Sequence, residues 1–215
     1  MRLVRLPGVF PPHSDSHLLA RTLARRVTRR DSVLDLCCGS GILAVTAGRA
    51  GAGSVTAVDV SRRAVACTWL NAVLNGTRVR ALRGDLFAPV AGERFDLIVT
   101  NPPYVPGATD PSHATGPARA WEGGAEGRAL IDRICEDIVP HLRPGGRLLM
   151  VQSSVNSRER TEALLEDEGL EVNVVDSSRG EYGALLSARA PELERSGLIS
   201  PGERVEDMLV VEAIR

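Results

Sequence analysis

Short apolar runs alternate along the chain with longer stretches of helical periodicity. The apolar runs, rich in Val, Leu and Ile, predict seven buried strands at residues 32–38, 55–60, 79–83, 95–100, 147–152, 172–175 and 208–214. Apolar residues spaced three or four positions apart predict helices at residues 14–29, 42–49, 61–74, 129–141 and 158–168. Ser14, Asp15 and Ser16 are N-cap candidates for the first helix, and Pro144-Gly145-Gly146 should end the fourth.

Strands that alternate with helices are joined by right-handed crossovers, which gives an α/β fold with a mostly parallel sheet and helices on both faces. A sheet of this kind binds ligands beyond the carboxyl ends of its strands. The 215 residues contain no internal repeat and no linker-like stretch. We therefore expect a single domain over residues 1–215, with an N-terminal segment and helix, residues 1–30, against the ligand site.

Composition excludes several classes of protein. The 26 basic residues are all arginine, which excludes a Schiff-base lysine and the lysine-containing phosphate loop of many nucleotide hydrolases. The four cysteines form no CxxC pair, so neither a zinc knuckle nor a disulfide framework is predicted. A formal net charge of -1 provides no uniform basic field for nucleic acid. With no apolar run near the roughly 20 residues of a membrane span and no signal-peptide stretch, we expect a cytoplasmic protein without membrane contact.

A glycine-rich turn follows the first predicted strand. Gly39, Gly41 and Ala44 complete the pattern GxGxxA between a strand and a helix, which lets a ligand approach the backbone near a helix N-terminus. Asp59 ends the next strand, 18 residues beyond Gly41, where a carboxylate can bind both hydroxyls of a ribose. Val60 follows it as a further candidate contact. The turn predicts an adenosine-containing cofactor and does not by itself separate NAD from S-adenosylmethionine.

Acidic residues near the turn favour one of these two cofactors. Asp35 lies two residues before Cys37, where its carboxylate would repel the pyrophosphate of a dinucleotide and attract a sulfonium. Asp85, after the third strand, is placed to accept a hydrogen bond from an adenine amino group, and Leu86 can cover the ring. A turn or helix cap is the alternative role for Asp85. The pattern therefore favours S-adenosylmethionine.

The segment Asn101-Pro102-Pro103-Tyr104 follows the fourth strand directly and is the most specific motif in the chain. Each proline fixes a φ angle and lacks an N–H donor, so the Asn101 side chain and the Pro102 carbonyl can be held toward the ligand cleft. Two such acceptors can bind both hydrogens of a planar NH2 group and direct its nitrogen at a methyl donor, while Tyr104 packs on its flat face. This arrangement suits methyl transfer to an amide or an exocyclic amine.

The motifs DLCCGSG, AVDV, GDLF and NPPY stand in the order and spacing of class I S-adenosylmethionine-dependent methyltransferases. Within that class the chain resembles the HemK-type family, which methylates the glutamine side-chain amide of polypeptide release factors. Residues 9–19 (VFPPHSDSHLL) are similar to the N-terminal segment of its short branch, and Trp121-Glu122-Gly123-Gly124 with Gly127-Arg128 is similar to the segment after NPPY. His13 and Ser14 depart from that pattern, and residues 178–199 have no match in it.

The resemblance implies a Rossmann-like, doubly wound sheet of seven strands, mainly parallel, with the last strand antiparallel. It implies a glutamine-bearing protein such as a release factor as substrate, and the short branch also uses a small zinc-binding activator subunit. Asn101, Pro102 and Tyr104 would act on the acceptor amide. The residues that would contact the cofactor are Ser16, Asp35, Gly39, Gly41, Asp59, Val60, Asp85, Leu86 and Asn101.

Three other functions stay open. An amino methyltransferase of the N6-adenine or N4-cytosine type could use NPPY on a nucleobase, although the near-neutral charge and the absence of a target-recognition domain argue against nucleic acid. An NAD-linked oxidoreductase could use the GxGxxA turn, which Asp35 disfavours. A non-catalytic cofactor-binding adaptor would have no need of Asn101.

Several remaining features predict no site of their own. Arg21, Arg25 and Arg29 share a helical face that we interpret as solvated. His13 and His17 have the i, i+4 spacing of metal ligands without a third ligand, so no metal is predicted. Trp69 has helical spacing from two valines, which predicts a core position.

Overall fold

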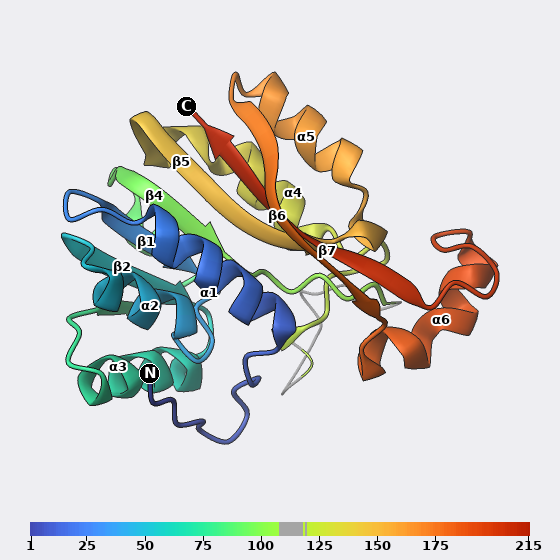
Figure 1. The fold of residues 1–215 in the computed structure, drawn as a ribbon, viewed down its shortest axis with the longest axis horizontal. Helices are drawn as coiled ribbons and strands as arrows, with labels where there is room; N and C mark the ends of the chain where they lie inside the picture. Colours follow the sequence, from blue (N-terminus) through green and yellow to red (C-terminus); the bar gives the residue numbers. More distant parts are fainter. Residues whose placement is uncertain (108–117, 119) are drawn as a thin grey trace.

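A computed structural model of the chain describes residues 1–107, 118 and 120–215. The strands form one sheet of seven in the order β3-β2-β1-β4-β5-β7-β6 (Figure 1). Their bounds are Ser32–Leu36 (β1), Ser54–Asp59 (β2), Arg80–Arg83 (β3), Phe95–Thr100 (β4), Leu142–Ser153 (β5), Glu171–Glu181 (β6) and Val205–Ile214 (β7). β7 is antiparallel to both of its neighbours, and the other pairings are parallel. The predicted fold class is confirmed.

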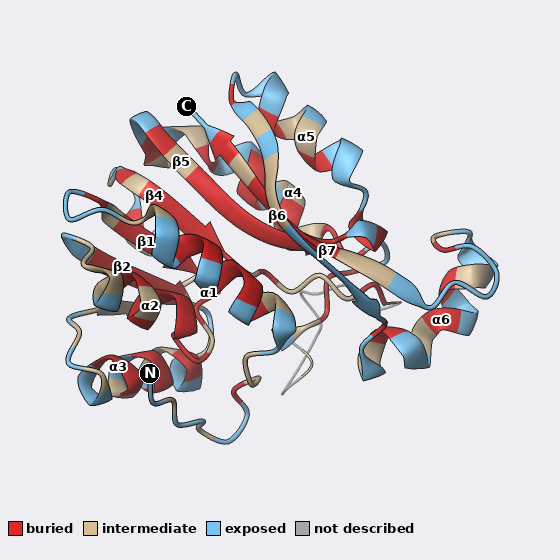
Figure 2. Cartoon of the chain, viewed as in Figure 1, coloured by how far each residue is buried: buried red, intermediate tan, exposed pale blue. Residues whose placement is uncertain are grey.

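Helices cover both faces of this sheet. Their bounds are Ser14–Arg26 (α1), Ile42–Ala50 (α2), Arg62–Leu74 (α3), Ala129–Asp137 (α4), Arg158–Asp167 (α5) and Ala184–Ser196 (α6). Successive residues of a strand point to opposite faces, so in β1 Val33 packs with α1 and α2 whereas Leu34 packs with α4 and α5. The central strands are buried from both sides (Figure 2).

Two predicted helix ends are wrong. α1 starts at Ser14, with His13 in the N-cap position, and it ends at Arg26 because Val27 is extended. Residues 14–16 therefore form its first turn rather than its cap, and Arg29 lies beyond the helix. The fourth helix ends at Asp137 and is followed by a 3-10 turn, Val139–His141, whereas Pro144-Gly145-Gly146 lies within β5.

The prediction that Trp69 belongs to the core is also wrong, because its side chain is 58% exposed. The buried face of α3 includes the polar residues Thr68 and Asn71. Thr68 donates to the Gly39 carbonyl and Asn71 to the Ser40 carbonyl, so α3 turns this face toward the glycine-rich turn. Trp69 is thereby rotated outward.

The part of the chain without a sequence match forms an extension of the sheet. β6 and β7 continue as a hairpin past the ends of their neighbours, and α6 connects them at the tip (Figure 1). α6 has a small hydrophobic core of its own, made of Val155, Tyr182, Leu186, Ala190, Leu193 and Ile199. The periodicity of α6 is interrupted by Pro191, which hid the helix from prediction.

Candidate active site

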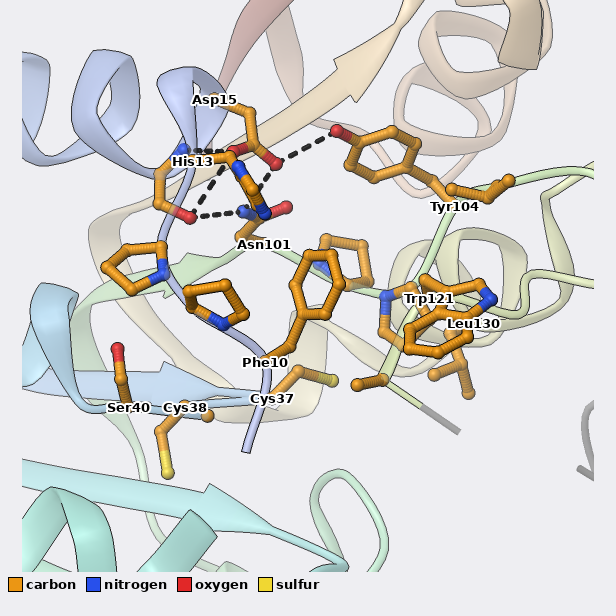
Figure 3. Close-up of a pocket in the computed structure, with 18 of the residues that line it drawn as sticks. Phe10, His13, Asp15, Cys37, Cys38, Ser40, Asn101, Tyr104, Trp121 and Leu130 are labelled. Carbon is orange, nitrogen blue, oxygen red and sulfur yellow. Dashed lines mark hydrogen bonds between the residues drawn. The ribbon is translucent and has the colours of Figure 1, made fainter. Parts of the chain in front are cut away.

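A cavity of about 1070 Å³ lies at the carboxyl ends of β1, β2 and β4. This is the edge where ligands bind in parallel α/β sheets. Its walls are residues 8–16, the glycine-rich turn, the end of β2, the NPPY segment, and the ends of β6 and β7 with the start of α6. Figure 3 shows the part of the cavity between α1 and NPPY.

The two glycines of the turn are required for different reasons. Gly39 has a φ of +52°, and the closest atom to the position of a Cβ is 3.9 Å away, so its open side leaves room for a ligand in the cavity that it lines. Gly41 has a φ of +80°, and a Cβ there would lie 2.8 Å from Thr68. Gly41 therefore allows α2 and α3 to pack closely and lies behind the cavity wall.

The two acids near the turn occupy different environments. Asp35 is fully buried, is not among the lining residues, and accepts a 2.9 Å hydrogen bond from the Ala44 N–H. Burial raises the pKa of Asp35 well above its ordinary value, and nearby Asp59 adds to the rise. Its Oδ1 has no hydrogen-bond partner among the described residues. Asp59 lines the cavity and accepts from the backbone N–H groups of Gly39, at 3.0 Å, and Ser61, at 2.8 Å.

Three further residues predicted to contact the cofactor lie along the same cavity, and two of them, Asp85 and Leu86, are assigned to adenine. Val60, Asp85 and Leu86 all line it. Asp85 forms a 2.6 Å ion pair with Arg133, and both side chains are about half exposed. Leu86 is buried and has a positive φ of 42°, unusual for a residue other than glycine.

The NPPY segment is tied to the first turn of α1. Asn101 donates through Nδ2 to Asp15 Oδ2, at 2.9 Å, and to Ser16 Oγ, at 3.0 Å. The Tyr104 hydroxyl donates to the same Asp15 oxygen at 2.8 Å (Figure 3). Because Nδ2 is held by α1, the amide oxygen of Asn101 is the end turned away from α1. Burial, and secondly Asp15, raise the pKa of Tyr104 well above 10, so this phenol stays neutral.

Sequence reasoning considered Asp15 only as a helix cap. The sequence feature that could have assigned Asp15 to the site is its position next to Ser16, in a segment already predicted to contact the cofactor. The hydrogen bonds that define its role run to residues 86 and 89 positions away. Such contacts depend on how the strands are ordered.

Two further missed residues stabilise the loop after NPPY. Asn156 donates to the Tyr104 carbonyl at 2.8 Å, and buried Arg128 donates to the Asn156 carbonyl and, at 2.8 Å, to that of Ser157. Gly127 lies so close that a Cβ would clash with the Tyr104 carbonyl. The Gly127-Arg128 pair thus holds Tyr104 in place.

The part of the cavity wall formed by β7 and the first turn of α1 carries acidic side chains. Glu206 of β7 accepts a 2.5 Å hydrogen bond from the Ser153 hydroxyl and lines the cavity together with Asp15. Burial raises the pKa of Glu206, and Asp15 contributes to the rise. Among the described residues, no group of three His, Cys, Asp or Glu side chains could hold a metal ion.

Residues 1–116 match the model of the methyltransferase small domain family. The chain belongs to the methyltransferase small domain family. Membership of this family identifies S-adenosylmethionine as the cofactor, and the NAD-linked alternative is excluded. Gly39 leaves open space next to the Asp59 carboxylate. This space fits the ribose of the cofactor's adenosine and the group attached to that ribose. None of the described helices combines the length and apolar character needed to cross a membrane.

Relatives of this small-domain methyltransferase include enzymes named for glutamine methylation. It is 32% identical over 168 residues to a Methanocaldococcus jannaschii protein that is provisionally named a protein N5-glutamine methyltransferase. This match covers 78% of this chain and 84% of that protein. It is 37% identical over 174 residues to the release factor glutamine methyltransferase of Bordetella pertussis. That match covers 76% of this chain and 63% of the Bordetella protein, so the chain spans less than two thirds of this longer bacterial relative.

Solved structures share the fold over nearly the whole chain. The E. cuniculi Mtq2-Trm112 complex, responsible for methylation of the eRF1 translation termination factor, has a TM-score of 0.68 at 22% identity, covering 97% of this chain and 99% of that one. A T. thermophilus 16S rRNA methyltransferase in complex with AdoMet and guanosine has a TM-score of 0.58 at 26% identity, covering 98% of this chain and 46% of that one.

Proposed function

We propose that the protein transfers a methyl group from S-adenosylmethionine to the side-chain amide nitrogen of a glutamine in a release factor or a similar protein. The observation that carries this proposal is the orientation of Asn101 by Asp15 and Ser16 at the mouth of the cofactor cavity. The names of the relatives support a glutamine amide as the acceptor.

The geometry explains how a weakly nucleophilic amide could react. With Nδ2 of Asn101 engaged by α1, its Oδ1 and the Pro102 carbonyl are the two acceptors that would bind the hydrogens of the acceptor NH2. This would orient the nitrogen toward the cofactor, whose sulfonium would supply an electrophilic methyl group. The new N–C bond would form as the S–C bond breaks, S-adenosylhomocysteine would leave, and the methylated nitrogen would then lose one proton to water. Neutral Tyr104 would pack on the planar amide, and Asp15 acts as a positioning residue for Asn101 and Tyr104. Alignment of this kind is the main contribution available without a strong base.

The cofactor contacts follow from the order of residues along the cavity. Asp59, held by two backbone N–H groups, would bind the ribose hydroxyls, with Val60 beside it. Asp85 and Leu86 would contact adenine, and Ser16 and Asn101 the amino acid end. Asp35 and Gly41 would act from behind the wall by supporting the turn.

A small activator subunit, zinc-binding as in the short branch, is part of this proposal. β3 is an edge strand, and the neighbouring α3 exposes three apolar side chains, Trp69, Val73 and Leu74, at 58%, 56% and 47%. A patch of this kind marks an interaction surface. If a subunit covers it, Trp69→Glu should leave cofactor binding unchanged while abolishing copurification of the subunit. Retained copurification would contradict this location.

We further propose that residues 1–215 act as one methyltransferase domain and that the reaction takes place in the cytoplasm, where translation factors are found. These two statements rest on the predicted acceptor and on the single continuous sheet.

The deciding experiment is transfer of labelled methyl from S-adenosylmethionine to purified release factors, ribosomal proteins, DNA and RNA from the same cell, followed by mass spectrometry of the labelled product. We expect one methylated glutamine in a protein. Label in adenine or cytosine instead would overturn the proposal in favour of a nucleic-acid amino methyltransferase.

A further inference from the structure

The tip of the β6–β7 hairpin lines the same cavity as NPPY, on the acceptor side. In β7 only alternate residues, Glu206 and Met208, line it, as expected for one face of a strand. In β6 four consecutive residues, 178–181, line it. Consecutive residues point to opposite faces, so the cavity meets the edge of β6 and not one of its faces. β6 is the last strand of the sheet, and its residues 177–181 are all exposed.

Two hydrogen bonds determine which backbone groups of β6 point outward. The Tyr182 N–H donates to the Arg204 carbonyl, so Tyr182 faces β7. The Asp207 N–H donates instead to Ser154 Oγ, at 3.1 Å, so Asp207 and its partner Arg179 form a non-hydrogen-bonded pair of the ladder. In such a pair the N–H and C=O of each residue point away from the other strand. The Arg179 backbone groups therefore point out from the sheet.

The same alternation turns the Glu181 backbone outward. Among the described residues, the outward groups of Arg179 and Glu181 have no hydrogen-bond partner in the structure. Between them, Gly180 shares a face with Glu206, and the position of its Cβ meets nothing within 4 Å. A glycine in a strand is typical of a place where another backbone approaches closely.

The extension is fixed relative to the site. The Arg189 side chain of α6 forms a 2.7 Å ion pair with Glu122, which is 4% exposed and lies in the loop after NPPY. On the other side, Thr22 of α1 donates to Asp176 of β6 at 2.6 Å. Since α1 also carries Asp15, the same helix is hydrogen-bonded both to β6 and to the NPPY segment, and it holds the two at a fixed position relative to each other.

We propose that the acceptor protein binds as an extended segment that adds to the free edge of β6 at residues 178–181, next to its glutamine in the active site. The proposal rests on the glutamine-amide function above and specifies how that substrate is recognised. Strand addition gives affinity through main-chain hydrogen bonds, and the surroundings of alternate side chains give specificity. Among the described residues, Asp15, Glu181 and Glu206 outnumber the one cation, Arg179, on this side of the cavity, so a segment with neutral or basic flanking residues fits better than a polyphosphate strand.

The first test uses Arg179→Pro in the full-length protein, compared with Arg179→Ala. Both variants remove the side chain and its charge, but only proline removes the outward N–H, which takes no part in pairing with β7. We expect KM for a peptide that spans the methylated glutamine to rise roughly three- to tenfold in Arg179→Pro relative to Arg179→Ala, the effect of one hydrogen bond. Binding of S-adenosylhomocysteine and the unfolding midpoint should be equal in the two variants.

The second test leaves the protein unchanged and so does not depend on folding of a variant. Peptides with a single N-methylated backbone amide, moved one residue at a time along the segment beside the glutamine, are assayed with the wild-type enzyme. Strand addition predicts that every second position is sensitive. Equal KM values for the two Arg179 variants, or sensitivity without this alternation, would overturn edge binding while peptide methylation itself persists. Failure of the wild-type enzyme to methylate any glutamine peptide or protein would instead overturn the proposed function, and the edge proposal with it.

Discussion

At the scale of single residues, one carboxylate orients the NPPY segment, which is the proposed acceptor site. Asp15 accepts from Asn101 Nδ2 and from the Tyr104 hydroxyl through the same oxygen. Two side chains of the NPPY segment are thus oriented from α1, although the two prolines between them already restrict the backbone. The predicted consequences of single substitutions therefore separate into effects on the acceptor and effects on the cofactor.

Replacing Asn101 by Ala should lower turnover on the true acceptor by about 10²- to 10³-fold at saturating cofactor, because a preorganised contact to the reacting NH2 is lost. Asn101→Asp should be nearly as poor on a glutamine amide. Asn173→Ala changes an exposed asparagine of β6 and serves as the control. Wild-type turnover in Asn101→Ala, measured by methyl transfer, would contradict the mechanism.

Replacing Asp59 by Ala should weaken binding of S-adenosylhomocysteine by roughly 10- to 150-fold, equivalent to about 1.5–3 kcal/mol, because hydrogen bonds from the ribose to a charged group are lost. Calorimetric titration measures this change. Asp59 also accepts from the Gly39 and Ser61 N–H groups, so Asp59→Asn, which keeps an acceptor oxygen, should lose less. An unchanged dissociation constant would reduce Asp59 to a structural role.

At the scale of elements, the hairpin extension with α6 is the part of the molecule that local patterns described least well. It contributes the part of the cavity wall that we propose faces the acceptor, and it is joined to the loop after NPPY by the ion pair of Arg189 with Glu122. A buried carboxylate that loses its partner is costly, because its charge has no compensating interaction.

Arg189→Met should therefore lower the free energy of unfolding by about 3 kcal/mol, measured by denaturant titration. The double variant Glu122→Gln with Arg189→Met should recover part of this loss, since no charge is then left buried. Arg195→Met, on the same helix but exposed, is the matched control. If the single and double variants are equally destabilised, the charge of Glu122 is not the cause.

At the scale of the whole molecule, buried carboxyl groups near the cavity link stability to pH. Burial raises the pKa of Glu206 above the ordinary value of 4.5, so the folded state holds this proton more tightly than the unfolded chain. Its contribution to stability is complete below pH 4.5 and is lost as pH rises through the raised value. Asp35 acts in the same direction.

Glu206→Gln should remove the part of this decline that belongs to Glu206. The stability of the variant relative to wild type should therefore increase from about pH 4.5 upward, by about 1.4 kcal/mol for each unit by which the pKa is raised. Denaturant unfolding at several pH values measures the difference. Glu181→Gln, an exposed carboxylate on the facing strand, is the control. A pH-independent difference for Glu206→Gln would contradict the assignment.

The sequence by itself determined the order of elements as far as β6, the seven strands of the sheet, the glycine turn and the NPPY motif to which we assign the chemistry. These features are local: strand alternation, helical spacing, a positive φ at glycine and the rigidity of two prolines all act over a few residues. For this reason β4 was predicted with its observed bounds, and the helix predicted at residues 61–74 is α3, with Ser61 as its N-cap.

Only the tertiary structure decided which distant residues meet. Asp15 reaches Asn101 across 86 positions and Glu122 reaches Arg189 across 67. Strand order decided that Asp35 supports the turn from behind while Asp59 lines the cavity, and hydrogen bonds to a neighbouring loop decided that Trp69 faces outward. These outcomes depend on which surfaces pack together, and that depends on the free energy of the whole fold and not on any local pattern.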